Sequence, residues 1–71
     1  MTDNPTEIVK PRAALMKKMR EIGLSQAELS RRTGRSVSEI CLIVNGKREA
    51  KLGVAKAIAD ELQMKVDDLF C

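Results

Sequence analysis

Lysine and arginine are the side chains of this chain best suited to chemistry, and they cluster along the sequence. The 71 residues hold 13 Lys and Arg against 10 Asp and Glu, a net charge of +3. Between Lys10 and Lys51, however, eleven Lys and Arg stand against four Glu, which is a net charge of +7. A basic body with acidic ends favours binding to a polyanion such as DNA, whereas the plainer alternative is a solubilising mix of charges.

Other kinds of chemistry have few residues to draw on. The sequence has no His, Tyr or Trp, which removes most acid–base catalysis, so we expect no enzyme. Cys41 and Cys71 cannot supply the roughly four ligands of a zinc site, so we expect no metal and no cofactor. No apolar run of about 18 residues and no export signal occurs. We therefore expect a cytoplasmic protein without a membrane span or a disulfide framework.

Two helix-start signals position the basic residues. Ser25 is followed three residues later by Glu28, and Ser36 is followed three residues later by Glu39. Each pair predicts a capping box, in which the serine hydroxyl accepts from a backbone N–H and the glutamate reaches back to the serine N–H. Gly34 between them suits a sharp corner. This spacing predicts a helix-turn-helix, whose second helix usually reads the DNA major groove.

The spacing of apolar residues predicts an all-α fold of five helices. We expect them at about residues 11–22, 26–33, 37–44, 52–62 and 66–70. Pro11 is expected to open the first helix, and Gly23 to end it. Residues 1–10 are expected to form a flexible N-terminal arm. Residues 11–71 would then be one helix-turn-helix domain, with the motif at about residues 25–46.

The motif resembles that of the Cro/phage-repressor family, also called the XRE family. The matching residues are Leu24, Ser25, Gln26, Glu28, Leu29, Gly34, Ser36, Ile40, Ile43, Asn45, Gly46, Lys47 and Arg48. The similarity extends over about residues 12–70, and the ending IVNGKR is also similar to HigA-type antitoxins, which have the same domain. The resemblance implies a five-helix, lambda-repressor-like DNA-binding domain.

The resemblance also implies which residues contact DNA. Base readout is expected from the turn and the outer face of the third helix, at Arg35, Ser36, Val37, Ser38 and Leu42. Phosphate contacts are expected at Ser25, Gln26, Asn45, Lys47, Arg48 and Lys51. Relatives commonly have polar side chains at the positions of Val37 and Leu42. These two residues therefore either contact thymine methyl groups or bury against a partner protein, and both readings stay open.

Several departures from the family pattern concern packing. Met19 and Val44 are apolar where many relatives have an Arg–Glu pair, so we expect packing to replace an ion pair there. Ser30 stands where relatives usually have alanine, at a close crossing of two helices. Gln63 and Lys65 stand where relatives usually have a glycine and a capping serine, which affects the boundaries of the last two helices.

We expect a small sequence-specific transcriptional regulator that binds double-stranded DNA. It would act as a homodimeric repressor on a pseudo-palindromic operator, with the third helix in the major groove. The dimer interface is expected in the C-terminal apolar cluster, at Met64, Val66, Leu69 and Phe70. The alternative is an antitoxin or other protein-interaction module that neutralises a toxin-like partner and regulates its own operon. The length, with no second domain after the fifth helix, is typical of Cro-type proteins and autoregulatory antitoxins.

Overall fold

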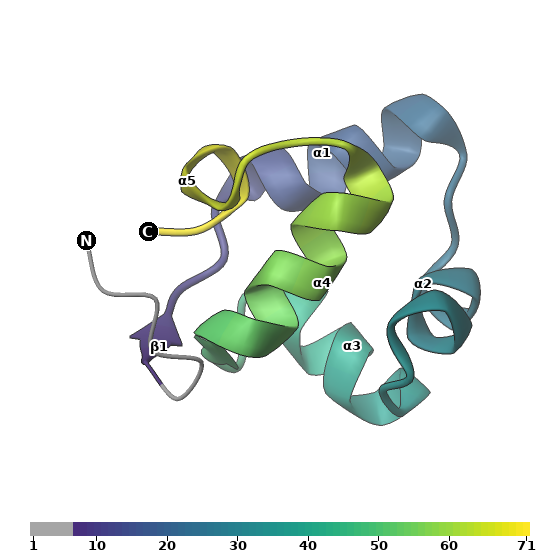
Figure 1. Cartoon of the computed structure of the whole chain (residues 1–71). Helices are drawn as coiled ribbons and strands as arrows, with labels where there is room; N and C mark the ends of the chain where they lie inside the picture. The colour runs from purple at the N-terminus through teal and green to yellow at the C-terminus, as the bar shows by residue number, and fades with distance from the viewer. Residues whose placement is uncertain (1–6) are drawn as a thin grey trace.

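The computed structural model describes residues 7–71, which form five helices and a two-stranded sheet (Figure 1). The helices are α1 (Ala13–Ile22), α2 (Gln26–Thr33), α3 (Val37–Val44), α4 (Leu52–Leu62) and α5 (Val66–Leu69). Strand β1 (Ile8–Val9) pairs antiparallel with β2 (Ala50–Lys51). The predicted five-helix, all-α fold is confirmed, and the short sheet is an addition to it.

Helices α2 and α3 begin at the two predicted serine caps. The hydroxyl oxygen of Ser25 accepts from the N–H of Glu28 at 3.1 Å, and that of Ser36 accepts from the N–H of Glu39 at 3.1 Å. The return bond of neither capping box is formed within residues 7–71, and in the first box the Glu28 carboxylate pairs with two arginines of α2 instead. Gly34 has a φ of 72° and ends α2 in the left-handed conformation that favours glycine.

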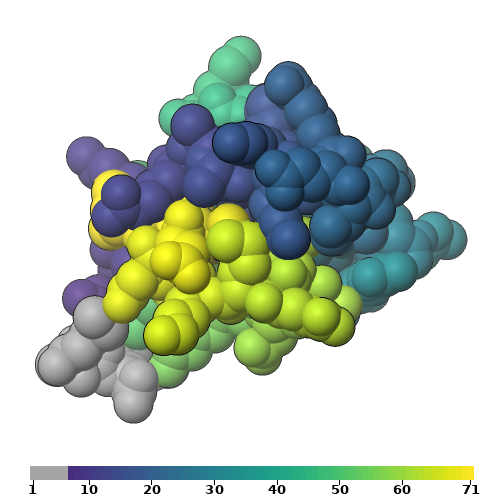
Figure 2. Space-filling view, turned by 90° about the horizontal axis from the view of Figure 1, so that it is seen from above, coloured from purple at the N-terminus to yellow at the C-terminus, as the bar shows by residue number. Residues whose placement is uncertain are grey.

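The segment before α1 differs from the expected flexible arm. Residues 1–6 lie outside the described residues, but residues 7–10 are part of the fold. Ile8 lies opposite Lys51 in the small sheet. The N–H of Lys10 donates to the carbonyl of Cys71 at 2.9 Å, and the Cys71 N–H donates back at 2.8 Å. The two ends of the described chain are therefore held together by backbone hydrogen bonds, and in Figure 2 they lie side by side.

The start of α1 is also later than predicted. Pro11 forms an isolated β-bridge with Phe70, so it lies in extended backbone and not in the first turn of a helix. Arg12 is the N-cap, with φ −97° and ψ 160°, and α1 begins at Ala13. At the other end, Gly23 has a φ of 68° and ends α1 as predicted.

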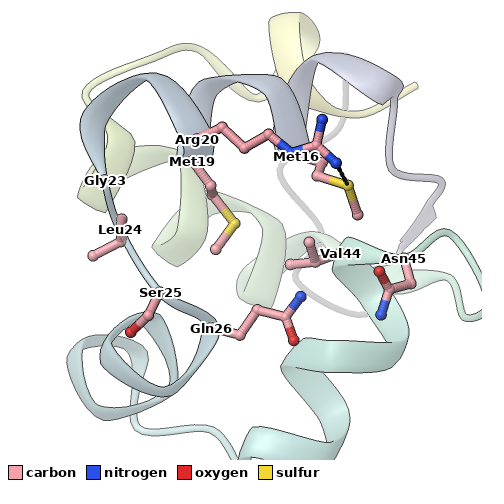
Figure 3. A pocket seen from close by; sticks show the side chains of 9 residues that line it. All are labelled: Met16, Met19, Arg20, Gly23, Leu24, Ser25, Gln26, Val44 and Asn45. Carbon is pink, nitrogen blue, oxygen red and sulfur yellow. Dashed lines mark hydrogen bonds between the residues drawn. The ribbon is translucent and has the colours of Figure 1, made fainter.

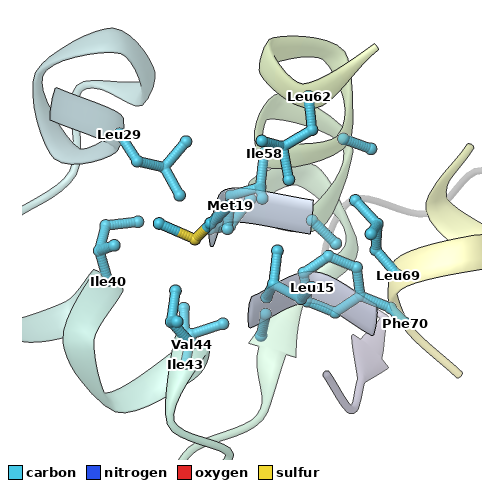
Figure 4. Close-up of a cluster of buried hydrophobic side chains, with 14 residues drawn as sticks. Leu15, Met19, Leu29, Ile40, Ile43, Val44, Ile58, Leu62, Leu69 and Phe70 are labelled. Carbon is cyan, nitrogen blue, oxygen red and sulfur yellow. The ribbon is translucent and has the colours of Figure 1, made fainter. Parts of the chain in front are cut away.

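Helix α4 passes through the middle of the molecule, with α3 on one side and α1 and α5 on the other (Figure 1). The buried apolar side chains come from all five helices and from β2 (Figure 4). The largest fully buried ones are Phe70, Leu15, Leu29, Ile40, Ile43, Ile58 and Leu69. This shared core fixes the position of α3 relative to the rest of the chain.

The C-terminal apolar cluster is mostly core and not surface. Leu69 is 0% exposed and Phe70 is 1% exposed, because α5 packs against both α1 and α4. The expectation that these two residues form a dimer interface is therefore wrong. Met64 and Val66 are only partly buried and keep accessible surface.

Candidate nucleic-acid interface

The turn between α2 and α3 determines how α3 is presented. Gly34 takes its left-handed conformation at this corner, and the N–H of Arg35 donates to the carbonyl of Ser30 at 3.1 Å. Ser36 then caps α3 in extended backbone, with φ −69° and ψ 151°. Because α3 packs on α2 through this tight corner, its start is held at one place on the surface.

The outer face of α3 holds the residues predicted for base readout. Each residue of an α-helix is rotated by about 100° from the previous one, so the buried Ile40 and Ile43 lie opposite Ser38 and Leu42. All five predicted readout residues are exposed: Arg35, Ser36, Val37, Ser38 and Leu42. Four of them therefore lie in the turn before α3 or in its first turn, and Leu42 lies about one turn further along the helix.

A hollow between α1, the start of α2 and the end of α3 contains half of the predicted phosphate contacts (Figure 3). Ser25 and Gln26 reach it from the start of α2, and Asn45 reaches it from the end of α3. Arg20 of α1 lines the same hollow, and Lys17 lines an adjoining hollow that also includes Arg20 and Asn45. We therefore add Lys17 and Arg20 to the candidate phosphate contacts, which the sequence analysis missed although their i, i+3 spacing indicates one basic helix face.

The other predicted phosphate contacts lie on different hollows. Lys47 and Arg48 line one that also includes Lys10. Arg48 and Lys51 line another, together with Arg35 from the α2–α3 turn. Two carboxylates, those of Glu39 and Glu49, also border this last hollow and reduce its positive charge. Cationic or polar side chains therefore lie on both sides of the outer face of α3.

Ion pairing separates two groups of arginines and lysines. Arg31 and Arg32 both pair with Glu28 of their own helix, and Arg32 also lies 3.9 Å from a carboxylate oxygen of Glu61. By contrast, no carboxylate of residues 7–71 pairs with the predicted phosphate ligands Lys47, Arg48 and Lys51, or with Arg35. The second group is thus available to bind an anion.

The pairing with arginine also affects the acidity of Glu28. A hydrogen bond from Arg31, followed by its positive charge and by a hydrogen bond from Arg32, lowers the pKa of the Glu28 carboxyl below its ordinary value of 4.5. The carboxylate form is favoured because both guanidinium groups stabilise the negative charge. Arg31 and Arg32 are therefore part of an exposed charge network on α2, which is distinct from the outer face of α3.

The sequence of this chain matches the helix-turn-helix family over residues 15–69. It belongs to the XRE-type helix-turn-helix family. Searches of curated proteins and of solved structures give no significant match. Proteins of this family are DNA-binding transcription regulators, so this chain is a DNA-binding transcription regulator of the XRE type. In the part of the chain that the structure describes, no helix is long and apolar enough to cross a membrane, and no group of three metal-ligating side chains occurs.

One departure from the XRE pattern lies at the floor of the hollow in Figure 3. Met19 is 4% exposed and Val44 is 6% exposed, and their side chains point toward one another. The expected replacement of an ion pair by apolar packing agrees with this burial. The XRE-type domain here therefore joins α1 to α3 by packing, in the same hollow that the polar side chains of Gln26 and Asn45 line.

Proposed function

We propose that this protein is a transcriptional repressor that binds a pseudo-palindromic operator as a homodimer, with α3 in the major groove. The observation that supports this most is the exposed outer face of α3, with basic or polar side chains near it that form no ion pair within residues 7–71. In protein–DNA complexes, phosphate contacts position the protein and base contacts specify the sequence. The arrangement has side chains suited to both tasks.

The phosphate contacts are proposed on both sides of α3. One group is Ser25, Gln26 and Asn45, extended by Lys17 and Arg20, and the other is Lys47, Arg48 and Lys51. The start of α2 adds free backbone N–H groups, which suit an anion. Base readout is proposed for Arg35, Ser36, Val37, Ser38 and Leu42. These basic groups would supply most of the affinity, and binding would weaken as salt rises.

The proposal of a dimer rests on the dimensions of the protomer and on the C-terminal residues that stay accessible to solvent. The protomer measures 31 × 21 × 20 Å, so two copies side by side are compatible with half-sites about 34–36 Å apart. Met64 and Val66 are the members of the predicted interface that keep accessible surface. A dimer bound across a promoter would occlude it, which is why we propose repression, in the cytoplasm, rather than activation.

An antitoxin is the second candidate function. The observation that favours it is the apolar character of the outer face of α3, where Val37 is 50% exposed and Leu42 is 39% exposed. Such side chains also suit the surface of a protein partner. A toxin-like reading frame beside the coding sequence would support this candidate.

Selection from a random duplex DNA library at near-physiological salt tests the proposed function. Enrichment of an inverted repeat is expected, and its half-site spacing would define the dimer. Enrichment of one half-site would contradict the dimer and leave DNA binding intact. Binding without any enrichment would contradict a sequence-specific regulator. A matched pair of variants checks the phosphate contacts: Lys47→Ala should weaken binding to every duplex, whereas Lys65→Ala should not, because Lys65 is exposed at the N-cap of α5 and lines none of the hollows described above.

A further inference from the structure

The most unusual surface of the molecule is the outer face of α3. Among residues 7–71, four large apolar side chains are exposed, and two of them, Val37 and Leu42, belong to this one helix. At about 100° per residue, Val37 and Leu42 point about 140° apart, and Ser38 lies between these two directions. Single exposed apolar residues are normal, but two beside a lone serine on the helix that enters the groove leave few hydrogen-bonding groups for base readout. We call Val37 and Leu42 the apolar ridge.

The surroundings of the apolar ridge are polar or basic on both sides. One hollow, at the end of α3, contains Gln26 and Asn45. The other, beside the first turn of α3, contains Arg35, Arg48 and Lys51 against Glu39 and Glu49, and so keeps a net positive charge of +1 (3 − 2). A B-DNA major groove has the same arrangement, because its two phosphate backbones lie about 12 Å apart on either side of the base edges. The charges beside the ridge therefore complement DNA, which makes the floor of a major groove the best-matched occupant.

From this arrangement we infer that Val37 and Leu42 recognise the C5 methyl groups of thymines. This inference rests on the proposed function and deepens it, because it identifies the chemical group that the operator must present. The thymine methyl is the apolar group that a base pair of unmodified DNA presents on its major-groove edge. Contact with it removes apolar surface from water on both partners. Arg35 and Ser38 would add hydrogen bonds to neighbouring base edges.

The spacing of the ridge limits where these thymines lie. Val37 and Leu42 are five residues apart, which is about 7.5 Å along a helix that rises about 1.5 Å per residue. Successive bases of one strand are about 3.4 Å apart along the duplex. This axial distance corresponds to about two base-pair steps, and the angle of about 140° between the two side-chain directions adds to it, so the two recognised methyl groups belong to different base pairs of each half-site.

Deoxyuridine substitution tests this directly, since deoxyuridine keeps the pairing of thymidine and lacks only the methyl group. The probe is the operator selected as described above, with each thymidine replaced in turn. We expect the affinity to fall about three- to fivefold at one or two positions of each half-site. Val37→Ala or Leu42→Ala should weaken binding to the unmodified operator by a similar factor. Each should also abolish the effect of deoxyuridine at its own position, because the contact is already lost.

Two control variants separate methyl recognition from other effects. Ile22→Ala removes an exposed apolar side chain from α1, and Lys47→Ala removes a proposed phosphate contact. Both should keep the full effect of deoxyuridine. Because Val37 and Leu42 are exposed, their alanine variants should keep the circular dichroism spectrum of the parent. Val37→Ser and Leu42→Ser, which also leave a short side chain, provide a second pair of variants for the same test.

The outcomes distinguish this inference from the proposed function. If the operator is bound specifically but no deoxyuridine changes the affinity, the inference is wrong and the proposed function stands. Operator binding by Val37→Ala and Leu42→Ala that equals the parent would also overturn it. If no operator is selected at all, both the inference and the proposed function fail.

Discussion

The hydroxyl of Ser30 donates a hydrogen bond to the carbonyl oxygen of Arg35, across the corner between α2 and α3. The N–H of Arg35 donates in return to the carbonyl of Ser30 at 3.1 Å, so the two residues are joined twice. Ser30 is only 6% exposed, and its hydroxyl is satisfied by this bond. Relatives usually have alanine here, and therefore lack the side-chain half of this connection.

This connection predicts the effect of Ser30→Ala. Loss of the hydroxyl should lower the free energy of unfolding by about 1 kcal/mol, the usual net value of one hydrogen bond. The matched control is Ser38→Ala, which makes the same change at an exposed residue of α3 and gains the same few tenths of a kcal/mol in helix propensity. Urea denaturation of both variants measures the difference. Equal stability of the two would show that the hydroxyl of Ser30 contributes nothing.

The packing between Met19 and Val44 predicts the effect of introducing a charge. Met19→Arg should lower the free energy of unfolding by about 2–3 kcal/mol, because an unpaired charge is placed against buried apolar groups. The open hollow beside Met19 lets a long side chain reach water, which keeps the loss below that of a fully enclosed charge. The double variant Met19→Arg, Val44→Glu should recover part of the loss in urea denaturation. If the double variant is only as stable as the sum of the two single changes predicts, the side chains at positions 19 and 44 do not interact.

The short sheet predicts that the N-terminal segment stabilises the domain. Deletion of residues 1–9 removes the pairing of Ile8 and Val9 with β2, and also the bond from the N–H of Leu52 to the carbonyl of Glu7 at 2.6 Å. We expect a loss of about 2 kcal/mol or more in the free energy of unfolding, at roughly 0.5–1.5 kcal/mol per hydrogen bond. Deletion of residues 1–6 alone, which keeps the strand, is the control. Equal melting temperatures of the two deletions would mean that β1 adds no stability.

The lowered pKa of Glu28 predicts a dependence on pH. The folded state favours the carboxylate, so this contribution to stability is present above the ordinary pKa of 4.5 and is lost as the pH falls through the lowered value. In an NMR titration of its carboxyl carbon, Arg31→Gln should raise the pKa of Glu28 toward 4.5. Arg35→Gln, which removes an arginine without an ion pair in residues 7–71, should leave it unchanged. An identical response of the two variants would contradict the assigned cause.

Local signals account for the parts of the fold that the sequence predicted well. The bounds of α2 and α3 were correct because Ser25, Ser36 and Gly34 act within a few residues of themselves. The return bond of the first capping box could not be anticipated in the same way. Arg31 and Arg32 lie three and four residues after Glu28 and compete for its carboxylate.

Long-range pairings account for what the sequence could not show. Lys10 and Cys71 pair through their backbones, which leaves no pattern in side-chain types. This pairing draws the C-terminus against the start of α1, which places Leu69 and Phe70 in the core rather than on a dimer surface. Most of the candidate DNA contacts could be predicted from the sequence because they are basic or polar residues at the ends of predicted helices. Their grouping into hollows with Arg20 required the position of α1 in space.

Glu39 provides a prediction in which affinity and stability change in opposite directions. Its side chain borders the hollow that contains Arg35 and Arg48, where it would repel a bound phosphate. Glu39→Gln should raise DNA affinity about two- to fivefold at low salt, and the gain should shrink as salt screens the charge. The same change removes a negative charge from the first turn of α3, which should lower the free energy of unfolding by about 0.3–1 kcal/mol.

Asp67→Asn is the matched control, since it also removes an acidic residue from the first turn of a helix, but in α5 on the far side of the molecule. Its stability should fall slightly while DNA affinity, measured by fluorescence anisotropy, stays constant. If both variants gain affinity equally, the effect is one of net charge alone, and Glu39 does not lie beside the DNA backbone.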